Sequence, residues 1–312
     1  MSIHIVVLNY NGVALLQECL PSVAAAAKAS PVPCKLSVLD NVSKDQSRDW
    51  VVKALPEVGW IQAPANRILF SYIDVVRELP EEYVLLLNND IKVEPDFIAP
   101  LWAALSADPE AFLASPKNLS FEGFYNGGRH ACGLRYAIPW AGPVYPGNLE
   151  AAEKTGYTLY TANGLFRRDR FVALGGFDPL FTWPGCWEDT DLGTRAWKRG
   201  WTCLYVPQSV IFHKGSATLE HQYEPYQRKA LGWRNGFIWF YANVSSPRLR
   251  LKFLLLILPT LLAAAVTGRF FLVDAFFRSL ASLPKALKRR GQERAFDVQD
   301  DETVWRRCRE DF

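Results

Sequence analysis

The chain has 312 residues, of which 49% are apolar and 21% are charged, and its formal net charge is +3. This composition predicts a globular protein with a sizeable core and excludes a disordered chain. The small net charge disfavours a dedicated nucleic-acid binder, which carries a concentrated basic surface. The six cysteines form no C-x-x-C pair and no zinc-ligand spacing with histidine, so we expect reduced thiols in a cytoplasmic protein.

The first hundred residues alternate between strand and helix patterns. The predicted strands, which are apolar and rich in β-branched residues, lie at 3–8, 34–39, 60–63 and 83–87. The predicted helices between them lie at 13–28, which contains Pro21, 46–55 and 68–79. This alternation predicts an α/β fold with a mostly parallel sheet and helices on both faces. The first run is too short for the apolar region of a signal peptide and lacks a basic flank, so we expect no secretory signal.

The middle of the chain is rich in Gly, Pro and aromatic residues. We expect residues 118–145 to form a long irregular excursion, with hairpins in it. A helix is predicted at 187–198, where Gly200 follows its end. A strand is predicted at 201–206, followed by a further apolar run that ends on His213.

The last section changes character at an uncharged run, residues 253–268. A helix that spans a membrane needs about 20 apolar residues, and this run is shorter and is expected to be interrupted at Pro259. We therefore expect a membrane-surface or re-entrant helical segment; a single span and a buried helical pair are the alternatives. The basic cluster Lys285, Lys288, Arg289 and Arg290 is expected to face anionic lipid headgroups.

Two domains follow from this change in character. The first is predicted over residues 1–245, and the second, a helical extension that associates with a membrane, over residues 246–312. Sheets of the predicted kind bind ligands outside the carboxyl ends of their strands. Polar clusters fall at three such ends, at 9–11, 40–45 and 88–90. Each of them also fits a turn or a helix cap, so their shared placement is more informative than any one residue.

Acidic residues also open the predicted helix at 187–198. Acids in a first helical turn suit the helix dipole, which is the simplest explanation. Asp191 and Arg195 lie four residues apart and are expected to pair on the helix surface. That pairing leaves Glu188 and Asp189 as candidates for a general base, and spacing alone does not choose between them. His213 fits either a structural histidine or a ligand.

Taken together, the motifs resemble those of family 2 glycosyltransferases, the inverting group with a GT-A fold, and within it the rhamnosyltransferase-like members. The resemblance covers about residues 3–218. The matching segments, in order, are VVLNYNG at 6–12, DNVSKD at 40–45, YVLLLNND at 83–90, TANGLFRRDRFVALGGFD at 161–178, WEDTDLGTRAWKRGW at 187–201 and HKGSAT at 213–218.

The resemblance implies a role for each matching position. Asp90 and His213 would hold a divalent cation, Mg²⁺ or Mn²⁺. Asp189 would be the catalytic base, with Glu188 supporting it or meeting the acceptor. The turn at 175–178 would shape the acceptor side. The residues implied to line the nucleotide pocket are Asn9, Asn11, Asp40, Asn41, Asn66 and Asn89.

The implied function is transfer of a sugar from a nucleotide-diphosphate-sugar donor to a hydroxyl of a glycan or lipid-linked glycan, with inversion. The implied setting is bacterial surface polysaccharide synthesis, by a protein bound peripherally to the inner face of the cell membrane. Two departures stand out: the acidic motif reads Asn88-Asn89-Asp90, and residues 66–72 lack the glycines that relatives carry.

The second departure supports an alternative, a non-catalytic member that binds a sugar nucleotide or scaffolds a glycan assembly complex. A dinucleotide-dependent oxidoreductase is disfavoured because no G-x-G-x-x-G follows the first strand. A nucleotidyltransferase is disfavoured because no Gly-rich basic loop occurs early in the chain.

Overall fold

The computed structural model describes residues 1–143, 149–181, 186–215 and 224–309. The end of the predicted excursion, at 144–145, and residues 216–218 of the last motif lie outside the described residues. The strands are β1 (Ile3–Asn9), β2 (Cys34–Asp40), β3 (Gly59–Gln62), β4 (Tyr83–Asn88), β5 (Ile91–Val93), β6 (Ala111–Ser120), β7 (Tyr125–Gly127), β8 (His130–Arg135), β9 (Ile138–Pro143), β10 (Gly156–Tyr157), β11 (Leu165–Arg167) and β12 (Thr202–His213).

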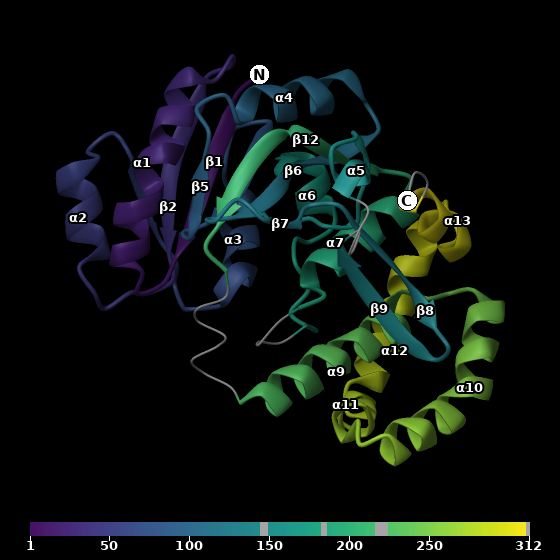
Figure 1. Ribbon diagram of the computed structural model, residues 1–312. Helices are drawn as coiled ribbons and strands as arrows, with labels where there is room; N and C mark the ends of the chain where they lie inside the picture. Colours follow the sequence, from purple (N-terminus) through teal and green to yellow (C-terminus); the bar gives the residue numbers. More distant parts are fainter. Residues whose placement is uncertain (144–148, 182–185, 216–223, 310–312) are drawn as a thin grey trace.

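Helices surround these strands and dominate the C-terminal third (Figure 1). The α-helices are α1 (Val13–Ala29), α2 (Ser47–Ala54), α3 (Tyr72–Val76), α4 (Ile98–Ala107), α5 (Leu149–Ala152), α6 (Arg168–Ala173), α7 (Glu188–Lys198), α9 (Pro225–Asn243), α10 (Pro247–Val266), α11 (Phe270–Leu280), α12 (Leu283–Glu293) and α13 (Asp301–Arg307). Two short 3₁₀ helices are η1 (Ile68–Ser71) and η2 (Arg294–Phe296).

One mixed, mostly parallel sheet organises the molecule. Its strand order is β10-β12-β6-β11-β4-β1-β2-β3, and β5 and β7 pair with β12 and β6 beside that path. The pairs β1–β2, β1–β4, β2–β3 and β6–β12 are parallel. β11 runs antiparallel between β4 and β6, which leaves β4 and β6 pointing the same way. The predicted α/β class is therefore confirmed.

The central strands are buried because their sequences are apolar on both faces. β1 (IHIVVLN) and β4 (YVLLLN) are almost wholly buried, as expected of strands covered on both sides. Val6 and Leu86 belong to one apolar cluster, and Ile5 and Leu85 to the other, on the opposite face of the sheet. This packing fixes the carboxyl ends of the strands along one edge.

The middle of the chain is more regular than the sequence suggested. Within the expected irregular excursion, β8 and β9 form an antiparallel hairpin, which confirms the expected hairpin. β6 and β7 pair in the main sheet, so much of the segment is strand rather than loop. The strand at 201–206 and the apolar run that ends on His213 form one strand, β12, with a register shift between Val206 and Val210.

The apolar run near the C-terminus forms one continuous helix, α10. Pro259 lies inside it, so the expected interruption was wrong. A proline removes one backbone hydrogen bond, but the Leu- and Ala-rich flanks favour helix on both sides. Ser246 caps its start by accepting from the Leu249 backbone N–H. By length and composition alone, α10 is long and apolar enough to cross a membrane, and 22% of its most apolar window is buried.

Only two of the four residues in the predicted lipid-facing basic cluster have exposed side chains in the structure. Lys285 and Lys288 are exposed on α12. Arg289 instead pairs with Asp191 of α7, at 2.7 Å, and with Asp178, at 3.4 Å. Arg290 donates to the backbone oxygens of Tyr241 and Val244. The expectation that all four face lipid was therefore wrong for both arginines, because acceptors within residues 1–245 hold them.

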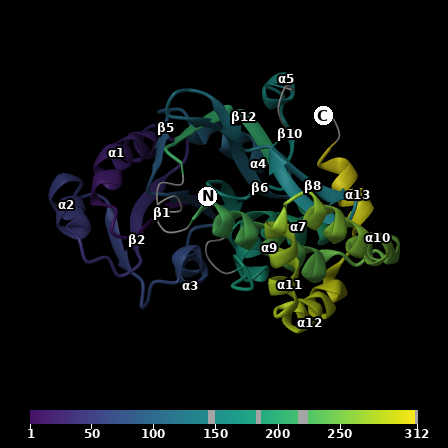
Figure 2. The same cartoon turned by 60° about the horizontal axis from the view of Figure 1, so that its bottom comes forward.

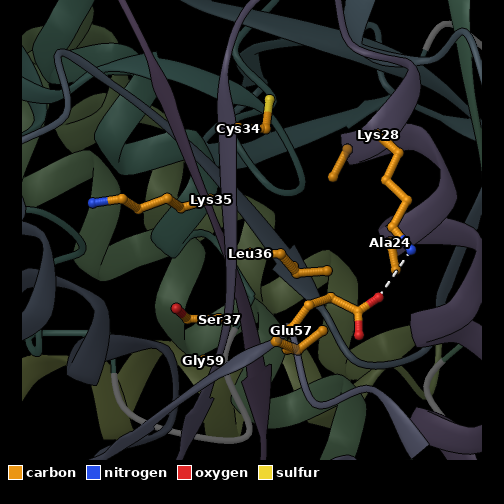
Figure 3. Close-up of a pocket in the computed structure, with 10 residues that line it drawn as sticks. Ala24, Lys28, Cys34, Lys35, Leu36, Ser37, Glu57 and Gly59 are labelled. Atoms are coloured by element: carbon orange, nitrogen blue, oxygen red, sulfur yellow. Dashed lines mark hydrogen bonds and ion pairs between the residues drawn. The ribbon is translucent and has the colours of Figure 1, made fainter.

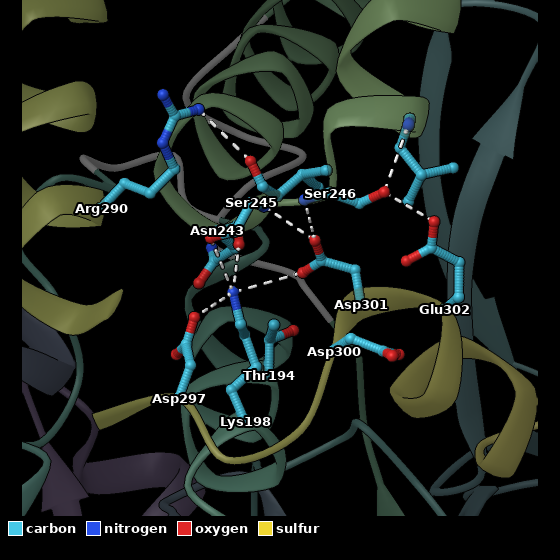
Figure 4. A network of polar contacts seen from close by, with 12 residues as sticks. Thr194, Lys198, Asn243, Ser245, Ser246, Arg290, Asp297, Asp300, Asp301 and Glu302 are labelled. Atoms are coloured by element: carbon cyan, nitrogen blue, oxygen red, sulfur yellow. Dashed lines mark hydrogen bonds and ion pairs between the residues drawn. The ribbon is translucent and has the colours of Figure 1, made fainter. Parts of the chain in front are cut away.

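Polar contacts also cross the predicted domain boundary at its far end (Figure 4). Lys198 of α7, with only 6% of its side chain exposed, pairs with Asp297 at 2.8 Å and with Asp301 at 3.3 Å. The Lys198 ammonium also donates to the Asn243 backbone oxygen. Asp301 accepts from the backbone N–H groups of Ser245 and Ser246, both at 2.7 Å. These contacts fasten the C-terminal segment to α7.

Candidate active site

Asp90 and His213 meet at the carboxyl edge of the sheet. Asp90 follows β4 and precedes β5, and β5 pairs with the end of β12 so that His213 lies opposite Ile91. The His213 Nε2 atom consequently lies 3.2 Å from Asp90 Oδ2. The Lys214 backbone N–H donates to the Asp90 backbone oxygen at 3.1 Å. Residues 123 positions apart in the sequence are thus brought together by one short strand pairing.

This pair fits a divalent cation that shares its coordination with a substrate. Asp90 Oδ1 is buried and has no hydrogen-bond partner among the described residues. Carboxylate oxygen and imidazole nitrogen are both ordinary ligands of Mn²⁺. The described residues contain no cluster of three or more His, Cys, Asp or Glu that could hold a metal. The remaining positions would then come from phosphate oxygens and water, as is usual for Mg²⁺ sites at phosphates.

A tight turn at 161–164 joins this edge to α7. Asn163 adopts a left-handed conformation (φ 58°), and its side-chain oxygen accepts from the Asn88 backbone N–H. Thr161 donates from its hydroxyl to the Asp189 backbone oxygen at 2.9 Å. The turn therefore ties the end of β4 to the first turn of α7, and brings Asp189 to the same edge as Asp90.

The two acids at the start of α7 lie in a setting that favours a proton on each. Burial raises the pKa of both Glu188 and Asp189, and the Asp189 charge raises the pKa of Glu188 further. Asp189 Oδ1 accepts from the Thr190 backbone N–H at 2.7 Å, which offsets part of the burial effect at Asp189. Glu188 Oε2 is buried without a partner among the described residues. The proton consequently favours Glu188, and Asp189 is the more acidic of the two.

Asp191 has a different role from its two neighbours. It pairs with Arg195 at 2.8 Å, as predicted, but both side chains are buried, so the expected surface location was wrong. The Asn243 amide also donates to Asp191, at 2.8 Å. The Arg289 and Arg195 charges hold the pKa of Asp191 below its usual range despite burial. Asp191 therefore anchors the helix.

Two polar residues of this region were not predicted from the sequence. Burial raises the pKa of Tyr160, and the charges of Asp189 and Asp90 add to that rise. Asn118 of β6 donates to the Tyr160 hydroxyl at 2.9 Å, while its own side-chain oxygen is buried without a described partner. The Asn163-Gly164 dipeptide is a turn signal that marks this region in the sequence.

The predicted nucleotide-pocket residues Asn9 and Asp40 are buried and bonded to each other. The Asn9 amide donates to Asp40 Oδ1 at 3.0 Å, and the Asn9 side-chain oxygen accepts from Asn89 at 2.8 Å. Asp40 also accepts from the backbone N–H and the hydroxyl of Ser43 and from the Gln62 amide. These contacts join the ends of β1, β2 and β4.

The side-chain amide of Asn41 is hydrogen-bonded to the segment at 66–72, which lacks the glycines of the family pattern. Its Nδ2 donates to the Ile68 backbone oxygen at 2.9 Å, and its Oδ1 accepts from the Ser71 hydroxyl at 2.6 Å. Ile68 itself has a φ of 56°, a left-handed conformation that a β-branched residue rarely adopts. The segment is the 3₁₀ helix η1 followed by the short helix α3, rather than one helix over 68–79.

Asn11 and Asn66 are the exposed members of the predicted pocket. The side-chain oxygen of Asn11 accepts from the Lys44 backbone N–H, and that of Asn66 from the Ile68 backbone N–H. Asn9 and Asp40 thus end β1 and β2, and the other four predicted pocket residues lie in the loops that follow β1, β2, β3 and β4. Their contacts with a nucleotide stay predictions.

A separate cavity lies at the opposite edge of the sheet (Figure 3). It opens between α1 and the first residues of β2 and β3, where Lys28 pairs with Glu57 at 2.9 Å. Ser37 lines it and bonds to the His4 ring at 2.9 Å. None of the residues that line this cavity belongs to the carboxyl-edge site, so the two are distinct.

The fold and the sequence both have counterparts among known proteins. One solved structure, GalNAc-T7 with UDP, GalNAc and Mn²⁺, aligns with a TM-score of 0.54 and 16% identity, over 78% of this chain and 48% of that chain. The chain therefore spans about half the length of that protein. The mannosyltransferase PcManGT from Pyrobaculum calidifontis, in complex with GDP-Man and Mn²⁺, aligns with a TM-score of 0.52 and 14% identity, over 94% and 74%.

A sequence relative comes from Mycobacterium tuberculosis. It is an N-acetylglucosaminyl-diphospho-decaprenol L-rhamnosyltransferase, 27% identical over 240 residues, which are 69% of this chain and 76% of the relative. Residues 83–284 match the profile described as glycosyl transferase family group 2.

The fold is thus that of the GT-A glycosyltransferases, as the resemblance implied. The chain belongs to glycosyl transferase family group 2, and the mycobacterial relative to which it is similar is a rhamnosyltransferase.

Proposed function

We propose that this glycosyltransferase moves a sugar, of the deoxyhexose class that includes rhamnose, from a nucleoside-diphosphate donor to a hydroxyl of a lipid-linked glycan, with inversion. The observation that carries the proposal is the meeting of Asp90 and His213 at the edge to which the turn at 161–164 ties the first turn of α7. The donor class is supported by the nucleotides bound in the two similar structures. The acceptor class is supported by the substrate named for the mycobacterial relative.

In this proposal Asp90 and His213 hold the divalent cation, Mg²⁺ or Mn²⁺. The free Oδ1 of Asp90 provides a carboxylate oxygen that no protein donor occupies among the described residues. When bound, the cation supplies charge neutralisation to the leaving diphosphate. A single protein carboxylate is enough where the substrate supplies phosphate oxygens.

Asp189 is the proposed base. It accepts the proton of the acceptor hydroxyl as that oxygen bonds to the anomeric carbon, and the bond to the diphosphate breaks on the opposite face. Glu188 holds a proton more tightly than Asp189, because the Asp189 charge raises its pKa. Glu188 is therefore suited to donate a hydrogen bond to the acceptor while Asp189 remains a carboxylate.

The six predicted nucleotide-pocket residues divide into two groups in this proposal. The exposed amides of Asn11 and Asn66 contact the nucleotide directly. Asn9, Asp40, Asn41 and Asn89 shape the pocket by holding the strand ends together, since their polar atoms bond to one another and to η1.

The test is Asp189→Asn, assayed with Mn²⁺ or Mg²⁺, a panel of nucleotide sugars and a lipid-linked acceptor. Asparagine keeps the shape and the bond from Thr190 but cannot take a proton, so turnover is expected to fall by about 10²–10⁴-fold. Unchanged turnover in this variant would overturn the base assignment. Wild-type protein that binds a nucleotide sugar calorimetrically without any turnover would instead favour the non-catalytic alternative.

We further propose that the segment 246–312 docks the protein on the inner face of the cell membrane, where surface polysaccharide is assembled. Large apolar side chains are exposed along one face of α10, at Leu251, Leu254, Leu255, Leu258, Leu262 and Val266. The opposite face packs inward through Phe253, Ile257 and Leu261. An apolar face flanked by Arg248, Arg250 and Lys252 is typical of a helix lying in the interface of an anionic membrane.

Flotation of the full chain with liposomes rich in anionic lipid tests this docking. Leu254→Glu together with Leu258→Glu is expected to abolish flotation without unfolding, because both side chains are exposed. Val52→Glu, at an exposed apolar residue on α2 far from α10 in Figure 1, is the matched control. Equal flotation of both variants would remove the membrane from the proposal.

A further inference from the structure

The residue before the two acids of α7 has an unusual backbone conformation. Trp187 caps the helix in the left-handed region, with φ 87° and ψ −13°. A bulky residue rarely adopts this conformation, and it persists only where the surroundings hold it. Its backbone oxygen accepts the first bond of the helix, from the Asp191 N–H at 2.7 Å. The backbone conformation of Trp187 therefore sets the direction in which the side chains of Glu188 and Asp189 project.

One face of α9 holds the Trp187 indole. A Cβ atom placed on Gly236 would lie 2.8 Å from the indole Cζ2, so only glycine leaves room for the ring. Trp239 packs on the Trp187 indole with ring centroids 5.2 Å apart. Trp305 of α13 stacks on Trp239 from behind, at 6.2 Å and 23°.

Polar contacts continue along the same face of α9. Asn235 donates to the Cys186 backbone oxygen at 3.2 Å, immediately before Trp187. The Trp239 indole N–H donates to the Thr194 hydroxyl, and Asn243 donates to Asp191. Residues 235, 236, 239 and 243 recur at the spacing of one helical face. Figure 2 shows α9 beside α7, with α11 and α12 packed on it.

We propose that this face of α9, Asn235, Gly236, Trp239 and Asn243, positions the acids of α7 by fixing Trp187 in its left-handed conformation. The proposal rests on the role of Asp189 given above. Gly236 and Trp187 are positioning residues, because they act on the acceptor proton only through Asp189. α9 belongs to the helical part of the chain that also carries α11 and α12, so that part contributes to the geometry of the reaction.

The positioning by α9 should act on kcat and not on donor binding. The metal pair Asp90 and His213 is built on β4, β5 and β12, none of which depends on Trp187. A disturbance at Gly236 should therefore lower kcat and leave the KM for the donor unchanged. A merely structural role would change both, or would lower the amount of folded protein.

The test compares two helix glycines, Gly236→Ala and Gly291→Ala. Both gain the same helix propensity, but a Cβ at Gly291 meets nothing within 4 Å. Gly236→Ala is expected to lower kcat by about tenfold or more, since displacements of about 1 Å at a reacting group cost up to 10²-fold. Gly291→Ala should match the wild type. A Gly236→Ala variant with wild-type kcat, or with kcat and donor KM changed together, overturns the proposal.

A double variant tests whether Gly236 acts through its contact with Trp187. Trp187→Phe replaces the indole by a smaller ring, so Gly236→Ala should cost much less in that background than in the wild type. Equal costs in both backgrounds overturn the proposal. If Gly236→Ala does not fold, Trp187→Gly replaces it: glycine adopts φ 87° freely but loses the anchor to α9, and kcat should still fall. Wild-type kcat in Trp187→Gly overturns the proposal.

Failure here is distinguishable from failure of the proposed function. A fully active Asp189→Asn removes the base on which the positioning acts. An inactive Asp189→Asn together with a fully active Gly236→Ala leaves the base in place and removes only the positioning by α9.

Discussion

The two halves of the carboxyl edge differ in whether their candidate site residues have all their hydrogen-bond partners within the described part of the protein. In the half built by β1, β2 and β3, the side chains of Asn9, Asp40 and Asn41 bond to one another or to neighbouring loops. In the half built by β4, β6 and α7, one oxygen each of Asp90, Asn118 and Glu188 is buried without a partner among the described residues.

We interpret this difference as a division between residues that stabilise the fold and residues that contact a ligand. A buried polar atom that is bonded contributes to stability, whereas one left unbonded costs about 1–3 kcal/mol. Folding alone does not favour such atoms, so these three oxygens are expected where a ligand completes their hydrogen bonds. The first half should therefore respond to substitution through stability, and the second through activity.

The largest effect is expected at Asp90. Asp90→Ala removes a proposed cation ligand and should lower turnover by about a hundredfold or more. The free energy of unfolding should change by less than about 1 kcal/mol, because the contact with His213 is partly exposed and Asp90 Oδ1 has no partner. Initial rates with saturating Mn²⁺ and urea unfolding measure the two quantities. Asp96→Ala, at an exposed acid six residues on, is the control.

The reverse pattern is expected at Asp40. Asp40→Ala leaves the buried amide of Asn9 and the half-buried backbone N–H of Ser43 without their acceptor, which should cost about 1–3 kcal/mol of unfolding free energy. Turnover of the remaining folded protein should change little. Asp49→Ala on the exposed side of α2 should be neutral. A stable Asp40→Ala with weakened nucleotide binding would break the comparison and make Asp40 a direct nucleotide contact.

A smaller effect concerns pH. Burial raises the pKa of Asp189, and the proposed base must be ionised, so turnover falls as pH drops through that raised pKa. The acid limb of the pH–kcat profile should therefore lie above the ordinary carboxyl range of about 4. Glu188→Gln removes the other buried acid, whose pKa the Asp189 charge raises. The acid side of the profile should then show a single ionisation. An acid limb at about pH 4 in the wild type would show that Asp189 is not the titrating base.

Much of the fold followed from the sequence because the informative residues are local. The apolar strands at 3–8 and 83–87 and the polar residues that follow them are sufficient to predict a parallel sheet and the edge at which we place the site. The contact of Asp90 with His213 depends on the pairing of β5 with β12, and β5 is too short to have a pattern of its own.

Other features depend on distant partners and left no local signal. Arg289 and Arg290 match a lipid-facing cluster in composition, yet their directions are set by Asp191 and by backbone oxygens of α9 and of the residue after it. The helix at Pro259 is decided by its flanks rather than by the proline. The left-handed backbone of Trp187 goes with the packing of its indole on Gly236, a contact between residues that are distant in the sequence.

The ion pairs of Lys198 have a consequence for protein engineering. Chimeras that exchange the C-terminal helices of one relative for those of another would naturally be joined near residue 245. Such a graft would deprive Lys198 of Asp297 and Asp301, and Asp191 of Arg289. An uncompensated buried charge costs on the order of 3–5 kcal/mol. A transplant that retargets the protein to a different membrane must therefore bring its own α7, and with it the residues that open that helix.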